Sequence, residues 1–169
     1  MRFEISHTFD AEPEQVAQAM FAADLAAHIS KEVPSIEGID PVSREESDTQ
    51  IKRKNKYRPV PVIRKVGPKE VKPEWMHFIE DTIYEKRTRT AQFKNVPTNG
   101  KIAELLENYG TMTLEALPGG KTKRTIKGEL KIKVFMLGAV AERIIYPHAE
   151  KILNEEARAL NNYIKTRKA

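Results

Sequence analysis

A long amphipathic segment near the end of the chain constrains the fold more than any other feature. Residues 136–167 are predicted to form one helix, because apolar side chains recur at spacings of three, four and seven. At about 1.5 Å per residue, roughly 30 residues span about 45 Å. That length exceeds the core of a small domain, so the helix must lie along an extended partner such as a curved sheet. These apolar positions are Leu137, Val140, Ala141, Ile144, Ile145, Ile152, Leu153, Leu160 and Ile164.

The composition predicts a single well-solvated domain spanning residues 1–169. Its 169 residues can bury one core, and a hydrophobic fraction of 40% with 31% charged residues is typical of a folded, soluble protein. The absence of cysteine excludes disulfides, thiolate metal sites and cysteine nucleophiles. No apolar run is long enough to predict a membrane helix, and the first residues lack a signal-peptide core. We therefore expect a cytoplasmic protein.

The net charge of +5 favours anionic partners. Solubility alone accounts for an excess of this size, and transient contact with an anionic membrane surface is the more specific expectation. Nucleic acid is not an expected partner, because the lysines that could form a basic face have no aromatic residues between them for base stacking. These lysines are Lys52, Lys54, Lys56, Lys131 and Lys133.

Most of the chain before the long helix has the alternation of β-strands. Residues 2–9 alternate polar and apolar, and residues 10–30 carry the signals of one or two short helices. Further strands are predicted near residues 36–42, 51–57, 75–80, 87–96, 105–117 and 122–134. Four prolines between Arg58 and Pro73 predict that Pro59–Pro73 is a rim loop rather than a central strand. This order predicts an α+β fold with helices on one side of an antiparallel sheet.

Two short motifs resemble one superfamily. His7–Phe9 followed by Pro13–Val16 resembles the opening of START-like (SRPBCC) proteins, and within them the PRELI/slowmo lipid-transfer proteins. Gly138–Glu142 running into Asn154–Ala157 is similar to a bacterial branch of that superfamily. The resemblance covers the whole chain in order. It implies a helix-grip fold, in which a curved antiparallel sheet wraps around a long C-terminal helix and leaves a hydrophobic cavity. Members bind sterols, phospholipids, polyketides or plant hormones, and some are cyclases or dehydratases.

Strand alternation points to polar groups inside this expected cavity. A row of like charges cannot be buried, so Lys52, Lys54, Lys56 and Arg58 should face water, which turns Arg53, Asn55 and Tyr57 inward. In the segment 87–96, Ala91 and Phe93 face inward, and by parity so do Arg87 and Arg89. Guanidinium groups there could hold a carboxylate or phosphate. The alternative is that they form structural ion pairs with Glu85, Asp81 or Glu107, or lie near the rim.

Other candidate chemistry is sparse. The four histidines lack the spacing of metal ligands, and the adjacent pairs Glu80-Asp81 and Glu155-Glu156 diverge, so we expect no metal, no cofactor and no catalytic dyad. His148 lies on the inward stripe of the helix as a core or cavity histidine, with acid/base catalysis as the alternative. Pro147 predicts a kink or break in the helix, and a hinge that opens the cavity is the sharper interpretation.

We therefore expect one helix-grip domain that binds, and could transfer, a hydrophobic or amphipathic lipid-like molecule with an anionic group. Two alternatives stay open: an enzyme of the cyclase or dehydratase type acting through His148 or Tyr109, and a protein-interaction module with a filled cavity and no ligand. The candidate ligand-binding residues are Arg53, Asn55, Tyr57, Arg87, Arg89, Tyr109, Ile126, Leu130, Val140, Ile144 and His148.

Overall fold

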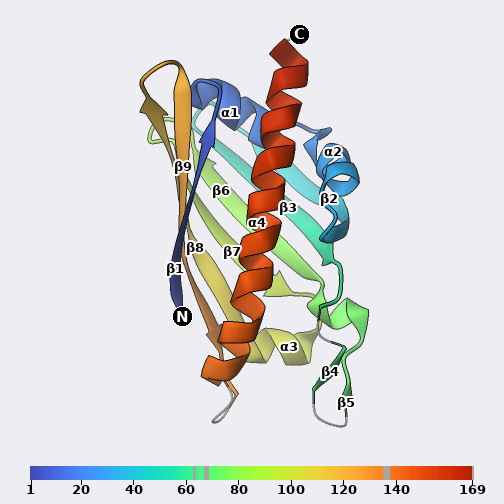
Figure 1. Ribbon diagram of the computed structural model, residues 1–169. Coiled ribbons are helices and arrows are strands. Elements are labelled where there is room, and N and C mark those ends of the chain that lie inside the picture. The colour runs from blue at the N-terminus through green and yellow to red at the C-terminus, as the bar shows by residue number, and fades with distance from the viewer. Residues whose placement is uncertain (63, 67–68, 135–137, 169) are drawn as a thin grey trace.

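A curved antiparallel sheet with a long helix across its concave side dominates the molecule (Figure 1). The computed structural model describes residues 1–62, 64–66, 69–134 and 138–168. Met136 and Leu137, at the start of the predicted helix, lie outside the described residues, as do Gly67 and Pro68 in the predicted rim loop. The predicted α+β, helix-grip fold class is confirmed.

The sheet has seven strands in the spatial order β1-β9-β8-β7-β6-β3-β2, and each neighbouring pair is antiparallel. A separate two-stranded ribbon, β4 and β5, lies between β3 and β6 in the chain. The strands are β1 (Arg2–Phe9), β2 (Ile36–Glu46), β3 (Gln50–Pro59), β4 (Lys65–Val66), β5 (Lys69–Glu70), β6 (Phe78–Glu85), β7 (Thr90–Pro97), β8 (Leu106–Leu117) and β9 (Lys121–Ile132).

Four α-helices and one 3-10 helix complete the described fold. α1 (Pro13–Met20) and α2 (Leu25–Glu32) follow β1 and pack against α4 (Gly138–Lys168). The 3-10 helix η1 (Pro73–Met76) and the short α3 (Gly100–Leu105) belong to the opposite end of the sheet (Figure 1). The 31 residues of α4 span about 46 Å at 1.5 Å per residue, and the helix continues through Pro147, so the predicted break does not occur.

The apolar core lies where α1, α2 and the C-terminal half of α4 cover the sheet. Phe9, Val16 and Val33 are completely or almost completely buried there. Among the described residues, every buried hydrophobic side chain of α4 lies at or after Ala157. The two halves of α4 therefore differ: the second half packs into the core, and the first half leaves space beneath it.

Two glycines let adjacent strands and aromatic rings approach closely in this space. Gly110 on β8 lies directly opposite Gly128 on β9. A Cβ at Gly110 would lie 2.2 Å from the Lys127 carbonyl oxygen, and one at Gly128 would lie 2.5 Å from the Phe3 ring. Side chains at either position would collide, so the space above the glycines is left to the rings of Phe3 and Phe93.

Several elements differ from the predicted ones. β6 begins at Phe78 rather than residue 75, because Pro73–Met76 form η1. β7 begins at Thr90 rather than residue 87, because residues 86–89 form a turn. The short helix α3 was not predicted; the Asn99 side chain caps it by accepting hydrogen bonds from the backbone N–H groups of Lys101 (3.1 Å) and Ile102 (3.3 Å). No helix in the described ranges is long and apolar enough to be a candidate membrane span.

Candidate functional site

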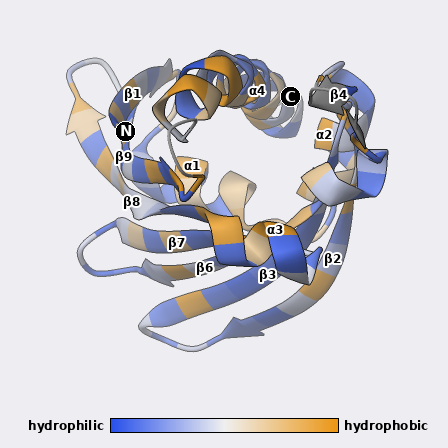
Figure 2. Ribbon diagram, turned by 90° about the horizontal axis from the view of Figure 1, so that it is seen from below, coloured by the Kyte–Doolittle hydropathy of each residue, from blue (hydrophilic) through white to orange (hydrophobic). Residues whose placement is uncertain are grey.

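A cavity of about 850 Å³ lies between α4 and the concave face of the sheet. Its walls come from α1, α2, α4 and most strands of the sheet, and apolar side chains make up most of the lining. Seen from below, the sheet and α4 form a ring around this interior (Figure 2). A volume of this size falls within the range typical of small-molecule sites.

One stripe of α4 faces the cavity. It consists of Ala141, Ile145, His148, Ile152, Glu156 and Leu160, spaced by three or four residues as one face of a helix requires. The sequence placed Val140 and Ile144 on this wall, and that placement is wrong: they are 54% and 51% exposed and do not line the cavity. Two apolar columns run side by side in this part of the helix, and the sequence did not distinguish the inner one from the outer one.

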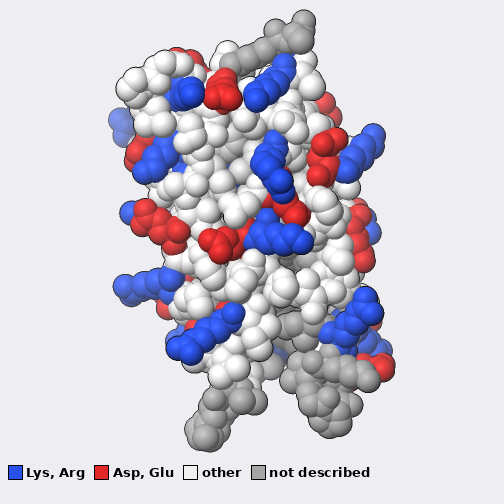
Figure 3. Space-filling model, in the orientation of Figure 1, with Lys and Arg blue, Asp and Glu red and all other residues white. Residues whose placement is uncertain are grey.

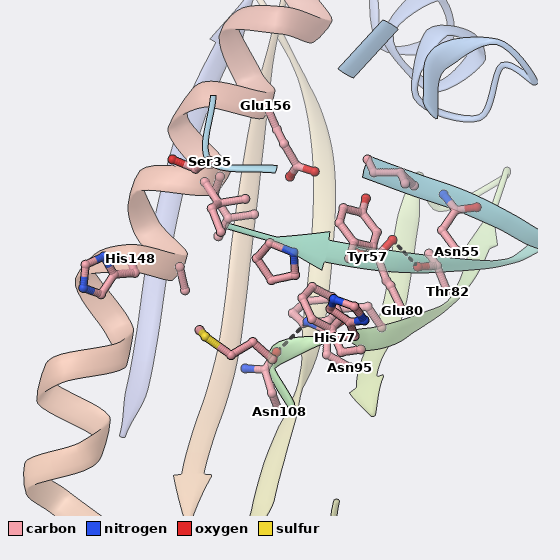
Figure 4. Close-up of a pocket in the computed structure, with 18 of the residues that line it drawn as sticks. Ser35, Asn55, Tyr57, His77, Glu80, Thr82, Asn95, Asn108, His148 and Glu156 are labelled. Carbon is pink, nitrogen blue, oxygen red and sulfur yellow. Dashed lines mark hydrogen bonds between the residues drawn. The ribbon is translucent and has the colours of Figure 1, made fainter. Parts of the chain in front are cut away.

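A row of polar side chains crosses the concave face of the sheet. Asn55 on β3, Glu80 on β6, Asn95 on β7 and Asn108 on β8 are direct cross-strand neighbours, and all four line the cavity (Figure 4). Direct neighbours on one face lie close enough for their side chains to interact. The row therefore gives a mostly apolar cavity a continuous band of amide and carboxyl groups.

The row is only partly satisfied by its own hydrogen bonds. The Asn95 amide donates to Oδ1 of Asn108 (2.6 Å), and the Asn108 amide donates to the Glu129 carbonyl oxygen (3.3 Å). Oδ1 of Asn95 is buried and has no hydrogen-bond partner among the described residues. A buried polar atom without a partner is costly, so this oxygen is the least satisfied acceptor of the row.

Arg53 holds Glu80 in place within this row. Its guanidinium donates to Oε1 of Glu80 and to the Met20 carbonyl oxygen, at 3.0 and 2.6 Å, and lies 4.9 Å from the centre of the Phe21 ring. Thr82 also donates to Oε1 of Glu80 (3.2 Å). Nε of Arg53 is buried and has no partner in the part of the chain that the structure describes. Arg53 is thus in a structural ion pair, as the alternative interpretation of the sequence stated, although its partner is Glu80.

Glu156 reaches from α4 toward the same region, and its carboxyl points toward the Tyr57 hydroxyl (Figure 4). Burial and, after it, the neighbouring Glu80 raise the pKa of Glu156 to about 7, against the opposing effects of Arg124, Arg53 and Tyr57. Oε1 of Glu156 is buried, and none of the described residues forms a hydrogen bond with it. The same burial raises the pKa of Tyr57, which stacks on Phe78 with ring centres 5.1 Å apart.

Arg124 on β9 is a further charged residue that lines the cavity. It is 6% exposed, its guanidinium lies 5.2 Å from the centre of the Phe9 ring, and Nη2 donates to Nδ1 of His7 (3.1 Å). Because Nδ1 accepts, Nε2 of His7 carries the proton and donates to Oδ1 of Asn154 (2.9 Å). Burial and the Arg124 charge lower the pKa of His7 to about 4, so this histidine is neutral near pH 7.

Of the eleven candidate residues chosen from the sequence, six line the cavity. The other five do not: Arg87, Arg89, Tyr109, Val140 and Ile144. The six are Arg53, Asn55, Tyr57, Ile126, Leu130 and His148. Arg87 and Arg89 lie in the β6–β7 turn outside the cavity; Arg87 is exposed, and Arg89 pairs with Glu14 of α1. The parity argument failed for them because the turn interrupts the strand before it reaches either residue.

Tyr109 lies on the other face of the sheet. Its side chain is 46% exposed, and its hydroxyl donates to Oε2 of Glu129 (3.1 Å). The Glu129 carboxylate raises the pKa of Tyr109. Asn108 and Met112, one residue before and three residues after it, line the cavity, so alternation along β8 puts Tyr109 on the outer face, where it cannot act on a molecule in the cavity.

Five cavity residues were not singled out from the sequence, although simple signals were present. Arg124 shares the strand face of Ile126 and Leu130, both of which were placed inside. Glu156 follows His148 by eight residues and therefore lies on the same helix face. The other three, Glu80, Asn95 and Asn108, precede or follow inward side chains by two residues. In the described part of the chain, no group of three or more His, Asp or Glu side chains is arranged to hold a metal ion.

Residues 4–164 match the family described as "Protein of unknown function (DUF2505)". No curated protein matches the chain in sequence. Among solved structures, TTHA0849 from Thermus thermophilus is similar with a TM-score of 0.71 and 11% identity over 100% of both chains. The Zhui aromatase/cyclase from Streptomyces sp. R1128 has a TM-score of 0.68 and 13% identity, covering 100% of this chain and 96% of its own. A START superfamily protein from Mycobacterium smegmatis has a TM-score of 0.55 and 12% identity, covering 98% and 97%. These likenesses show the START-like helix-grip fold.

Proposed function

We propose that this chain, which belongs to the DUF2505 family, binds a hydrophobic or amphipathic small molecule in the cavity between α4 and the sheet. Relatives in fold include an aromatase/cyclase and a START superfamily protein, so the fold accommodates more than one use of such a cavity. The cavity of about 850 Å³ is the observation that carries the proposal, because it favours an occupant over the alternative of a filled interior.

The lining supports an elongated ligand with an apolar body and a polar group. Ile126 and Leu130 on β9 and Ile145 and Ile152 on α4 give the cavity opposing apolar walls. The polar row from Asn55 to Asn108 crosses between them, and Oδ1 of Asn95 has no partner within the described residues. Apolar walls supply affinity through burial, and a few polar groups fix the orientation of the ligand.

Four apolar residues indicate where a ligand enters. Val60, Val62, Leu105 and Val134 line the cavity and are nevertheless exposed to solvent, and the segments that carry them lie at the α3 end of the sheet. On the face that α4 presents, acidic and basic side chains are interspersed (Figure 3). A transient contact of the protein with an anionic membrane would therefore be made through these four apolar residues. Co-sedimentation with anionic vesicles tests this contact, and we expect Val62→Asp to abolish it.

Native mass spectrometry of the full chain purified from its own host, followed by solvent extraction, tests the proposal. We expect a bound molecule that survives transfer into the gas phase and is recovered in the organic phase. Protein that carries no small molecule, and that also binds none from a lipid extract of the same host, would contradict the proposal. An extracted molecule altered by fresh protein would favour the cyclase or dehydratase alternative.

A further inference from the structure

Arg124 is a buried cation that forms no ion pair within the described part of the chain. It is only 6% exposed, lines the cavity, and forms no ion pair with any carboxylate of the described residues. His7, which accepts a hydrogen bond from Arg124, is neutral near pH 7, and Nε of Arg124 has no partner among the described residues. Burying a charge is costly unless a counter-charge or several hydrogen bonds compensate for it. Within the described residues, compensation of the Arg124 charge therefore depends on Glu156 or on an anion in the cavity.

The neighbouring charges do not supply that anion fully. Arg53 on β3 and Glu80 on β6 neutralise one another at 3.0 Å. Glu156 on α4 is the remaining acid that faces Arg124, and burial together with Glu80 raises its pKa to about 7. When Glu156 holds its proton, Arg53, Glu80, Arg124 and Glu156 carry one net positive charge; when it is ionised they carry none. The Tyr57 hydroxyl, also facing Glu156, stays neutral because burial raises its pKa.

We propose that the cavity selects ligands with a single carboxylate group, which pairs with Arg124 while Glu156 takes up a proton. This inference rests on the proposed function and names the ligand class for the same site. The ligand carboxylate supplies the counter-charge, the Arg124 guanidinium donates to it, and protonated Glu156 changes from a competing anion into a hydrogen-bond donor. One net charge matches a monoanion, so a phosphate dianion is a poorer fit.

Because binding of a carboxylate is coupled to protonation of Glu156, the affinity for the ligand depends on pH in a defined way. Below pH 7, Glu156 is already protonated and the affinity for an ionised carboxylate is constant. Above pH 7, binding must protonate Glu156, so the affinity falls by at most about tenfold for each pH unit. A neutral ligand of the same length does not need this proton uptake, and its affinity should not change with pH.

Calorimetric titration with sodium dodecanoate, methyl dodecanoate and dodecyl phosphate at pH 6.5 and 8.5 tests this. We expect dodecanoate to bind at least about tenfold more weakly at pH 8.5, whereas methyl dodecanoate binds equally at both pH values. Glu156→Gln should remove the pH dependence of dodecanoate binding. Arg124→Gln should weaken dodecanoate by about 10- to 100-fold and leave the ester unchanged, with the exposed Arg87→Gln as the matched control.

The outcomes separate the two proposals. Equal binding of acid and ester, independent of pH, would overturn the carboxylate inference and leave the binding function standing. Tighter binding of dodecyl phosphate than of dodecanoate would overturn the choice of a monoanion. Failure of all three probes would contradict the proposed function itself. If Arg124→Gln does not fold, as judged by circular dichroism, Glu156→Gln decides the question.

Discussion

Replacing Glu156 by glutamine should make the protein more stable at neutral and alkaline pH, although it removes a charged side chain from the centre of the fold. The substitution keeps the size of the side chain and its capacity for hydrogen bonds, and it removes only ionisation. Any change in stability that depends on pH therefore reports the cost of ionising this one buried group.

The magnitude follows from the two pKa values. In the unfolded chain the Glu156 carboxyl has its ordinary value of 4.5, and in the folded protein its pKa is about 7. Below pH 4.5 both states hold the proton and the group costs nothing. Between pH 4.5 and 7 the unfolded state loses the proton first, so the free energy of unfolding falls by about 1.4 kcal/mol per pH unit. Above pH 7 the loss is constant at about 3 kcal/mol.

His7 has the opposite effect on the free energy of unfolding, over nearly the same pH range. Its pKa is lowered to about 4 in the folded protein, so the stability it contributes is present above pH 6.5 and is lost as the pH falls toward 4. The His7 side chain is partly open to solvent, so its contribution is smaller than the shift alone implies. In the unaltered protein the two effects partly cancel. Glu156→Gln should reveal the His7 effect as a stability that rises with pH.

Urea unfolding followed by circular dichroism at pH 4.5, 5.5, 6.5 and 8 measures this. The difference in unfolding free energy between Glu156→Gln and the unaltered protein should grow by about 3 kcal/mol across the series. Glu115→Gln, at an exposed position of β8, is the control and should show no such trend. A difference that changes by less than about 1 kcal/mol would refute the claim that Glu156 is buried and protonated near neutral pH.

Two further predictions concern the sheet and the turn. Gly110→Ala should destabilise the protein by about 2–3 kcal/mol in urea unfolding, because its Cβ would lie 2.2 Å from a backbone oxygen. The control Gly100→Ala has open space around its Cβ and should change the free energy of unfolding by less than about 0.5 kcal/mol. Equal effects of the two substitutions would contradict the close approach of β8 and β9. The double variant Arg87→Gln, Arg89→Gln should bind dodecanoate as tightly as the unaltered protein, and a loss of affinity would return the β6–β7 turn to the binding site.

The sequence predicted the fold well because the fold depends on long periodic patterns. The spacing of apolar residues in residues 136–167 specified the long helix, and alternation specified most strands. Side-chain placement failed where a local event shifted the pattern. The turn at 86–89 moved Arg87 and Arg89 off the strand, and two adjacent apolar columns on α4 made Val140 indistinguishable from Ala141.

The polar part of the cavity was less accessible to sequence reasoning for a different physical reason. Asn55 and Asn108 become members of one row only when the cross-strand register of four strands is known. Similarly, the raised pKa of Glu156 depends on burial and on Glu80, a residue far away in the chain. Alternation can show that a residue faces inward, but it cannot show which other inward residues will lie beside it.

A matched pair of tryptophan variants on α4 tests the central claim most directly. Ala141 faces the cavity and Val140, the preceding residue, faces solvent, so Ala141→Trp should project an indole ring into the cavity while Val140→Trp should leave the cavity unchanged. Isothermal titration of the unaltered protein and both variants with sodium dodecanoate at pH 6.5 is the measurement. We expect Ala141→Trp to weaken binding and Val140→Trp to retain it. Unchanged affinity in Ala141→Trp, with both variants folded, would contradict a ligand site between α4 and the sheet.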